Sequence, residues 1–136
     1  MATSGYPSAL ARATRWKARN LSGEANGTPV GSVSTNDHED FAGLLHLFAL
    51  DVASSWQRRG IGSQLIYAVE VEAQRQELNG VYLEVNVDSH DAIRLYERLG
   101  YRREGDWFVN RWTDHLEHGS QLEVSEVCHR MFKRFP

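Results

Sequence analysis

Apolar and polar positions recur at different periods along this chain, and each period predicts a type of element. Residues 44–52 are apolar on both faces, which predicts a strand near the centre of a sheet. Residues 62–78 repeat apolar side chains at helical spacing and predict a helix buried along one stripe. The stripe consists of Leu65, Ala68, Val69 and Ala73, with Gln, Glu and Arg on the other side. Residues 81–87 alternate and predict a strand with Glu84 opposite the continuous apolar face.

Turn residues extend this pattern towards both ends of the chain. An Asn-Gly pair supplies the positive φ angles of a tight turn and predicts a hairpin of residues 13–21 and 29–35. Two further strands are predicted near residues 101–112 and 122–132, joined by a polar loop. The sheet therefore receives strands from both halves of the chain.

A second helix is predicted between these strands, over residues 90–99. Ser89 is expected to cap its start, and Gly100 suits a left-handed stop. The predicted order is β, β, β, α, β, α, β, β, which indicates an α/β or α+β class with a mixed sheet. The length of 136 residues fits one domain, residues 1–136.

Charge and cysteine content narrow the classes of partner. The net charge of -3 and the isoelectric point near 6.0 argue against a nucleic-acid partner. No apolar stretch reaches the length of a membrane span, so no membrane partner is expected. Cys128 is the single cysteine and lies on a predicted strand, so we expect it to be buried rather than nucleophilic and the protein to be cytoplasmic.

The segment "QRRGIGSQLI", residues 57–66, carries the first chemical signal. A glycine loop that opens a helix presents free backbone N–H groups, and Gly60 and Gly62 leave room for a phosphate and tolerate unusual φ angles. A dinucleotide fingerprint would need a third glycine where Leu65 stands, and the P-loop pattern is absent. The alternative is a bare helix-start loop with solvated arginines.

Two segments in order then resemble one family. The pattern Gln57-x-x-Gly60-x-Gly62 after "ALDV" resembles the acyl-CoA pyrophosphate loop of the GNAT superfamily of N-acetyltransferases, and "LEVNVDSHDAIRLYERLGY" resembles its following strand and helix. The resemblance is strong over residues 44–104 and closest to bacterial enzymes that acetylate protein N-termini, including that of a ribosomal protein. It implies a mostly antiparallel mixed sheet with a splayed central strand pair and flanking helices. Residues 1–12 cannot hold the family's usual first strand and two helices, so a shortened N-terminus is expected.

The resemblance implies acetyl-CoA as co-substrate and no metal. Backbone groups of Leu50, Asp51 and Val52 would contact the pantetheine arm. The family usually has Asn where Ser89 stands, and that side chain touches the cofactor. The remaining cofactor contacts would come from Gln57, Arg58, Arg59, Gly60, Ile61, Gly62 and Ser63.

The resemblance also assigns the proton transfers. Glu84 occupies the position of the base, and Tyr96 occupies the position of the acid. Each has an alternative: Glu84 is a strand residue paired with a surface arginine, and Tyr96 fills a core stripe. His46 is a second candidate base, or a structural histidine on its strand.

The implied function is an acyltransferase that moves an acetyl group from acetyl-CoA to a primary amine, by direct attack in a ternary complex. A protein N-terminus is a favourable acceptor, because an α-amine of pKa about 8 is far more often neutral at pH 7 than a lysine of pKa about 10.4. A second copy of the chain is a candidate to complete the acceptor site, with Trp107 and Trp112 as dimer contacts. The alternative function is a non-catalytic acyl-CoA-binding module. His115 and His118 suggest a solvated loop rather than a metal site.

Overall fold

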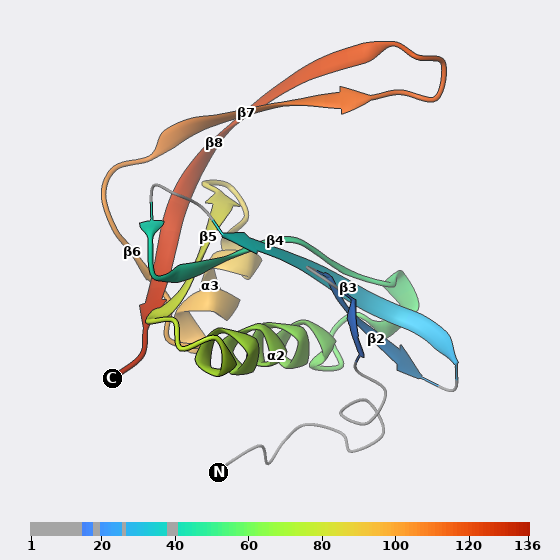
Figure 1. Cartoon of the computed structure of the whole chain (residues 1–136). Helices are drawn as coiled ribbons and strands as arrows, with labels where there is room; N and C mark the ends of the chain where they lie inside the picture. The colour runs from blue at the N-terminus through green and yellow to red at the C-terminus, as the bar shows by residue number, and fades with distance from the viewer. Residues whose placement is uncertain (1–14, 18–19, 26, 38–40) are drawn as a thin grey trace. The chain divides into compact units, whose positions relative to one another are not determined.

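The computed structural model of the chain (Figure 1) is described here for residues 15–17, 20–25, 27–37 and 41–136. These residues fall into two compact units, each of which is described by itself. The first unit runs to Tyr82 and takes in Arg134–Pro136, and the second unit is Leu83–Lys133. Residues 1–14, on which the expectation of a shortened N-terminus rests, lie outside the described residues.

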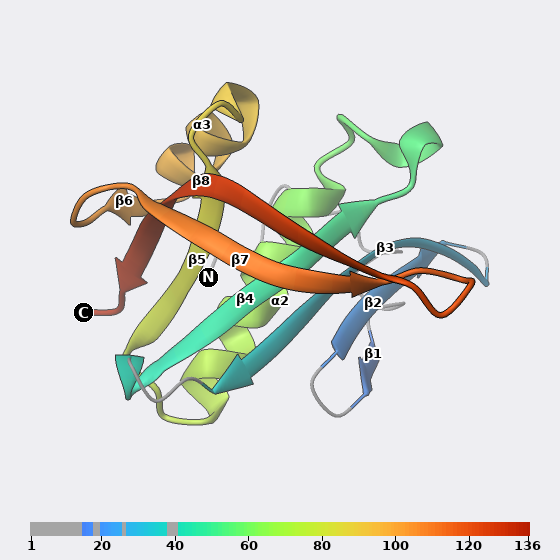
Figure 2. The same ribbon diagram turned by 90° about the horizontal axis from the view of Figure 1, so that it is seen from above.

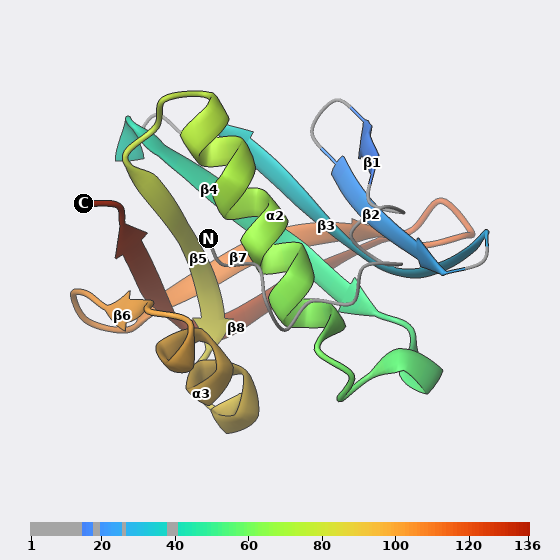
Figure 3. The same cartoon turned by 90° about the horizontal axis from the view of Figure 1, so that it is seen from below.

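The first unit is a sheet covered by one helix. Its strands, in spatial order, are β1 (Arg15–Lys17), β2 (Asn20–Ala25), β3 (Thr28–Asp37), β4 (Leu44–Val52) and the start of β5 (Gly80–Asn86). The first three pairings are antiparallel, and β4 runs parallel to β5 from Leu44 beside Gly80 to His46 beside Tyr82. Helix α2 (Ile61–Arg75) packs against β2, β3 and β4 (Figure 3).

The predicted strands of the first unit are largely confirmed. The strand over residues 44–52 has β3 and β5 as neighbours, so its central place is confirmed. A hairpin with Gly27 at a φ of 79° is also present, but its first strand is Asn20–Ala25 rather than residues 13–21. The segment predicted as one strand over residues 13–21 contains parts of two antiparallel strands, with Lys17 facing Asn20 across the β1–β2 ladder.

Helix α2 differs from its prediction at its C-terminal end and on its buried face. It ends at Arg75, before the predicted residue 78, and Glu77 takes a φ of 60° just beyond it. Its core side chains are Ile61, Leu65, Ile66, Val69 and Ala73. The expectation that Gln and Glu lie on the exposed side is wrong at Gln64 and Glu72, which are both buried. Glu72 lies on the same stripe as Leu65, seven residues earlier.

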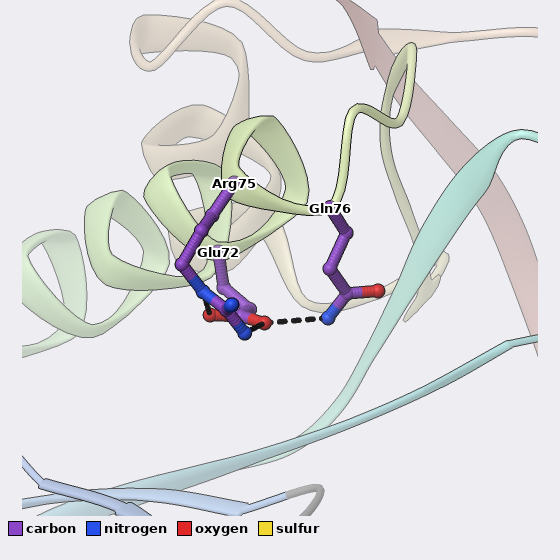
Figure 4. A network of polar contacts seen from close by, with 3 residues as sticks. All are labelled: Glu72, Arg75 and Gln76. Carbon is purple, nitrogen blue, oxygen red and sulfur yellow. Dashed lines mark hydrogen bonds and ion pairs between the residues drawn. The ribbon is translucent and has the colours of Figure 1, made fainter.

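Glu72 is held by two side chains that close over it (Figure 4). Arg75 donates from Nε to Oε1 at 2.7 Å and from Nη2 to Oε2, and Gln76 donates from Nε2 to Oε2 at 2.6 Å. The Glu72 side chain is 6% exposed, whereas that of Arg75 is 71% exposed. The hydrogen bonds from Arg75 hold the pKa of Glu72 below its usual value, against the opposing effect of burial.

The second unit contains the end of β5, one helix and a long antiparallel hairpin (Figure 2). Its elements are α3 (His90–Arg98), β6 (Arg102–Arg103), β7 (Phe108–His115) and β8 (Gln121–Arg134). Strand β8 pairs with β6 and β7 and neighbours β5. Its buried side chains include Leu83, Val85, Ile93, Tyr101, Cys128, Met131 and Phe132.

Two predictions in the second unit need correction. The strand predicted over residues 101–112 is broken into β6 and β7, because the chain turns through Gly105 at a φ of 76°. Strand β7 in turn continues to His115, so the polar loop shortens to residues 116–120. The left-handed stop at Gly100 is confirmed, with a φ of 102°. None of the helices in the described part of the chain has the length and apolar character that a bilayer crossing requires.

Candidate functional site

The chain leaves β4 through a short loop that is fixed by its own hydrogen bonds. Ala53 N–H donates to the Val30 carbonyl at 2.8 Å, and Trp56 N–H donates to the Ala53 carbonyl at 2.8 Å, across the 3-10 turn η2 (Ser54–Trp56). Gln57 donates from Nε2 to the Val52 carbonyl at 3.1 Å. The Gln57 side chain therefore fastens the loop to the end of β4, and its contact with a cofactor stays a prediction.

Helix α2 begins with a set of backbone donors that have no acceptor within the helix. Gly60 is its N-cap, at φ 80° and ψ 9°, and the first helical bond runs from Gln64 N–H to the Gly60 carbonyl at 3.1 Å. The N–H groups of Ile61, Gly62 and Ser63 precede that bond. The N-cap, a glycine, makes no side-chain capping hydrogen bond, and no acidic residue lies in the first turn. This end of the helix therefore presents partial positive charge without a carboxylate to compensate for it.

The two loop glycines have different roles. A β-carbon on Gly60 would meet nothing within 4 Å, so the space beside this residue is open. Gly62 is the second residue of α2 and lacks a positive φ, so the expected unusual φ is wrong at this position. Arg58 takes a φ of 63°, which the sequence did not indicate. Arg58 and Arg59 are exposed, and the Arg59 guanidinium lies 4.9 Å from the ring centroid of Trp56.

Strand β4 carries a bulge just before this loop, which the sequence did not reveal. Ser32 faces Asp51 and Ser34 faces Phe48, so two residues of β4 stand opposite one residue of β3. One of the two is Ala49, at a φ of 53°. An extra residue of this kind is left out of the ladder, and bulges are frequent beside active sites. Leu50, Asp51 and Val52 follow the start of this irregularity.

Gly31 of β3 is a further residue that the sequence analysis did not select. A β-carbon there would lie 2.9 Å from the Asp51 carbonyl oxygen, 3.0 Å from Leu65 Cδ1 and 3.2 Å from Ile61 Cγ2. Its missing side chain therefore allows the first turns of α2 to approach β3 and β4. A glycine inside a strand is the signal that could have indicated this close approach.

The environment of His46 is that of a structural histidine. Its ring stacks on Tyr82, with centroids 4.7 Å apart, and on Phe48 at 5.3 Å. His46 Nδ1 lies 3.0 Å from Asn36 Oδ1, and this nitrogen must be the donor because an amide oxygen only accepts. Stacking and hydrogen bonding thus fix the ring within the first unit.

Glu84 is located on β5, in the second unit, and is paired with an arginine. Its Oε2 lies 3.7 Å from Arg130 Nε on β8. The ion pair with an arginine that was the alternative for Glu84 is therefore present. Arg130 is 30% exposed, however, and is not an open surface residue. The Glu84 side chain is 18% exposed, so water retains limited access to the carboxylate.

Tyr96 and Ser89 both belong to α3. Tyr96 is buried, its ring meets Tyr101 edge to face at 6.1 Å, and burial raises the pKa of its hydroxyl above the ordinary value. Ser89 is the N-cap residue, but its side chain makes no capping hydrogen bond, so the expected side-chain cap is wrong. The Ser89 carbonyl accepts the first hydrogen bond of the helix, from Ile93 N–H at 2.9 Å.

Cys128 is buried, as predicted. Burial, followed by the charge of Glu126 and a hydrogen bond to it, raises the pKa of the Cys128 thiol to about 12. A thiol of this kind is a poor nucleophile at neutral pH. His115 and His118 are exposed, and the residues that the structure describes contain no group of three metal-ligating side chains.

The structure thus gathers the predicted cofactor residues Leu50–Val52 and Gln57–Ser63 around one end of β4 in the first unit. Glu84, Ser89 and Tyr96 belong to the second unit. Gly31, the β4 bulge and Arg130 are not among the features predicted from the sequence.

Comparison with known proteins places this arrangement in a family. Residues 3–101 match the model of the acetyltransferase (GNAT) family, which extends the likeness upstream of the segment that carries the motifs. An N-alpha-acetyltransferase of Sulfurisphaera tokodaii is 37% identical over 59 residues, which cover 42% of this chain and 35% of that protein. The matched segments span only 34–40% of the length of the curated relatives.

Solved structures share the fold. The ribosomal-protein-S18-alanine N-acetyltransferase of Escherichia coli superposes with a TM-score of 0.65 at 23% identity, over 88% of this chain and 71% of that one. A putative streptothricin acetyltransferase of Bacillus anthracis, solved with acetyl coenzyme A, gives a TM-score of 0.67 at 17% identity, over 86% of this chain and 63% of that one. The resemblance and the fold class inferred from the sequence are confirmed: the chain belongs to the acetyltransferase (GNAT) family.

Proposed function

We propose that this protein transfers the acetyl group of acetyl-CoA to a primary amine, by direct attack in a ternary complex. The observation that carries the proposal is the start of α2. There the N–H groups of Ile61, Gly62 and Ser63 follow the N-cap Gly60, after the loop that leaves β4 and within the segment matched to the family. The names of related proteins support it, since they include N-alpha-acetyltransferases.

The donors at the start of α2 suit the pyrophosphate of acetyl-CoA. Backbone N–H groups at a helix N-terminus bind phosphate oxygens, and the open space at Gly60 allows close approach. Arg58 and Arg59 add positive charge on the exposed loop. The backbone of Leu50, Asp51 and Val52, from the bulge to the end of β4, would pair with the pantetheine arm. No metal is required for this chemistry.

We assign the proton transfers to Glu84 and Tyr96. The amine nitrogen forms a bond to the thioester carbonyl carbon, and the carbon–sulfur bond breaks. The proton released by nitrogen goes to the Glu84 carboxylate, directly or through a water molecule. The Tyr96 hydroxyl supplies a proton to the departing thiolate; a tyrosine is protonated at neutral pH at its ordinary pKa of about 10, and burial raises the pKa of Tyr96 further.

The acceptor class that we favour is an α-amine at the N-terminus of a protein or peptide. Such an amine is neutral in an appreciable fraction at pH 7, so one carboxylate suffices to remove the remaining proton. A small-molecule amine is the other acceptor class. We also propose a cytoplasmic setting, where a single cysteine stays reduced.

A second copy of the chain is proposed to complete the acceptor site. Two exposed tryptophans support this. Trp107, just before β7, is 60% exposed, and Trp112, in β7, is 38% exposed. Sedimentation of the wild type against a Trp107→Ser variant tests it. A monomer at the concentrations at which acetylation is measured would argue against the dimer.

The function is tested by separating binding from turnover. Acetyl-CoA affinity and acetylation of N-terminal peptides, lysine peptides, polyamines and aminoglycosides are measured for the wild type, Glu84→Gln and Tyr96→Phe. We expect the variants to keep their acetyl-CoA affinity and to lose about a hundredfold or more in turnover. A wild type that binds acetyl-CoA but acetylates none of these amines would support the non-catalytic binding module. A wild type that does not bind acetyl-CoA would exclude both functions.

A further inference from the structure

Arg130 of β8 contacts two side chains that come from different strands of the second unit. Its Nε lies 3.7 Å from Glu84 Oε2 on β5. Its guanidinium carbon lies 4.0 Å from the centroid of the Phe108 ring on β7. The guanidinium is therefore in contact with an aromatic ring and with the carboxylate that the proposed function uses as a base.

We propose that Arg130 is a positioning residue, which fixes the direction of the Glu84 carboxylate while Phe108 fixes Arg130. This inference rests on the proposed function, in which Glu84 accepts the proton of the amine. Glutamate has several rotatable bonds, and a base must lie within hydrogen-bond reach of the proton that it removes. An error of about 1 Å in the position of such a group is enough to cost a large factor in rate.

The backbone around Glu84 is held independently of Arg130. Two residues along β5, Asn86 Nδ2 donates to Glu126 Oε2 on β8 at 2.9 Å. The Asn86 side chain is itself oriented, because its Oδ1 accepts from Asp88 N–H at 2.8 Å. A change at Arg130 is therefore expected to release the Glu84 side chain and to leave β5 in place.

The contacts favour arginine over lysine at this position. A guanidinium is planar, so it can lie over an aromatic ring and still hold its charge beside a carboxylate, as Arg130 does in its 3.7 Å ion pair with Glu84. An ammonium group would keep an ion pair with Glu84 and lose the planar stacking on Phe108. Turnover is therefore expected to fall in the order wild type, Arg130→Lys, Arg130→Met.

A kinetic cycle tests whether Arg130 acts through Glu84. Arg130→Met is expected to lower kcat by about tenfold or more, with the KM for acetyl-CoA changed by less than about twofold. Combined with Glu84→Gln it should change kcat by less than about twofold, because the residue through which it acts is already gone. Arg103→Met is the matched control, since Arg103 forms an exposed 4.0 Å ion pair with Glu97 in the same unit. Equal kcat values in Arg130→Met and Arg103→Met would overturn the inference.

A spectroscopic measurement separates this inference from the proposed function. The Nε–H resonance of Arg130, assigned by its loss in Arg130→Lys, is expected to move in Glu84→Gln and to stay in place in Glu97→Gln. If the wild type acetylates no amine, the proposed function fails, and this resonance still decides whether Arg130 holds Glu84. A resonance that does not respond to Glu84→Gln overturns the positioning contact whatever the activity.

Discussion

Gly31 of β3 lies so close to β4 that a β-carbon on it would stand 2.9 Å from the carbonyl oxygen of Asp51. The same atom would lie 3.0 Å from Leu65 Cδ1 of α2. Neither the backbone of β4 nor the buried Leu65 side chain can shift easily in a closely packed core. The hydrogen that glycine has in place of a β-carbon therefore sets how closely the start of α2 approaches the sheet.

Gly31→Ala is therefore expected to destabilise the protein by about 1–3 kcal/mol, because the new methyl group overfills a packed site. It should also weaken acetyl-CoA binding, since α2 and the end of β4 must shift together. Urea unfolding and calorimetric titration measure the two effects. Ser32→Ala, at the exposed neighbouring position, is the control and should stay within about 0.5 kcal/mol of the wild type. A Gly31→Ala variant as stable as this control would contradict the packing argument.

The buried carboxylate of Glu72 gives a second prediction. Arg75→Met removes the donor that lowers the pKa of Glu72 most and leaves the carboxylate buried with Gln76. We expect the Tm to fall by about 3 to 6 °C at neutral pH. Because the folded pKa of Glu72 is lowered, its stabilising effect is present above the ordinary value of 4.5 and is lost as the pH falls through the folded value. The difference in Tm between wild type and variant should accordingly shrink on acidification.

The control for this prediction is another arginine at the same helical spacing. Arg94 pairs with Asp91 three residues away, and the two side chains are 65% and 93% exposed. Arg94→Met should change the Tm by no more than about 1 °C, because exposed pairs contribute little. Equal losses in the two variants would show that burial of Glu72 does not matter.

Much of the fold and the cofactor loop could be predicted from sequence because their signals are local. The apolar residues over 44–52 predict the central strand, and the glycines at positions 60 and 100 predict the start of α2 and the end of α3 to within one residue. Strand ends were less predictable. The pattern of residues 101–112 predicts one strand, but the structure has two. The break between them depends on the positive φ of Gly105, which the apolar pattern does not indicate.

The features that the sequence did not reveal depend on contacts between distant residues. The Glu84–Arg130 pair joins residues 46 positions apart in the sequence, and neither position departs from an ordinary alternating strand. The bulge at Ala49 likewise has no signal in the sequence. Alanine rarely takes a positive φ, and there is no glycine at this position to indicate one. The charge of Glu72 predicts the solvent side of the helix, whereas its spacing from Leu65 and Val69 predicts the buried side. The spacing is the correct indicator here, because Glu72 is buried.

Tyr96 gives a prediction about alkaline pH. Burial raises the pKa of its hydroxyl above the ordinary value of 10.0. The Tyr96 hydroxyl should therefore stay mostly protonated up to about pH 10. The folding stability that this group contributes is present below about pH 10, its unfolded value, and is lost as the pH rises through the folded value. The phenolate absorbance of wild type minus Tyr96→Phe should therefore develop only above about pH 10. A phenolate that forms below that pH in the folded protein would contradict the effect of burial on this hydroxyl.

Cys128 allows the opening of the second unit to be followed by chemistry. The thiol is 1% exposed, and its pKa is raised to about 12, so little thiolate forms and reagents reach it only when the structure opens. We expect iodoacetamide to leave the folded protein unmodified at mildly alkaline pH and to label it in urea. Because the chain has one cysteine, mass spectrometry reports this site alone, and Cys128→Ser gives the background. Arg130→Met should label more slowly than unfolded protein if β8 stays in place, as the positioning role requires. Labelling of the folded wild type at the rate of the unfolded chain would show that the thiol is accessible.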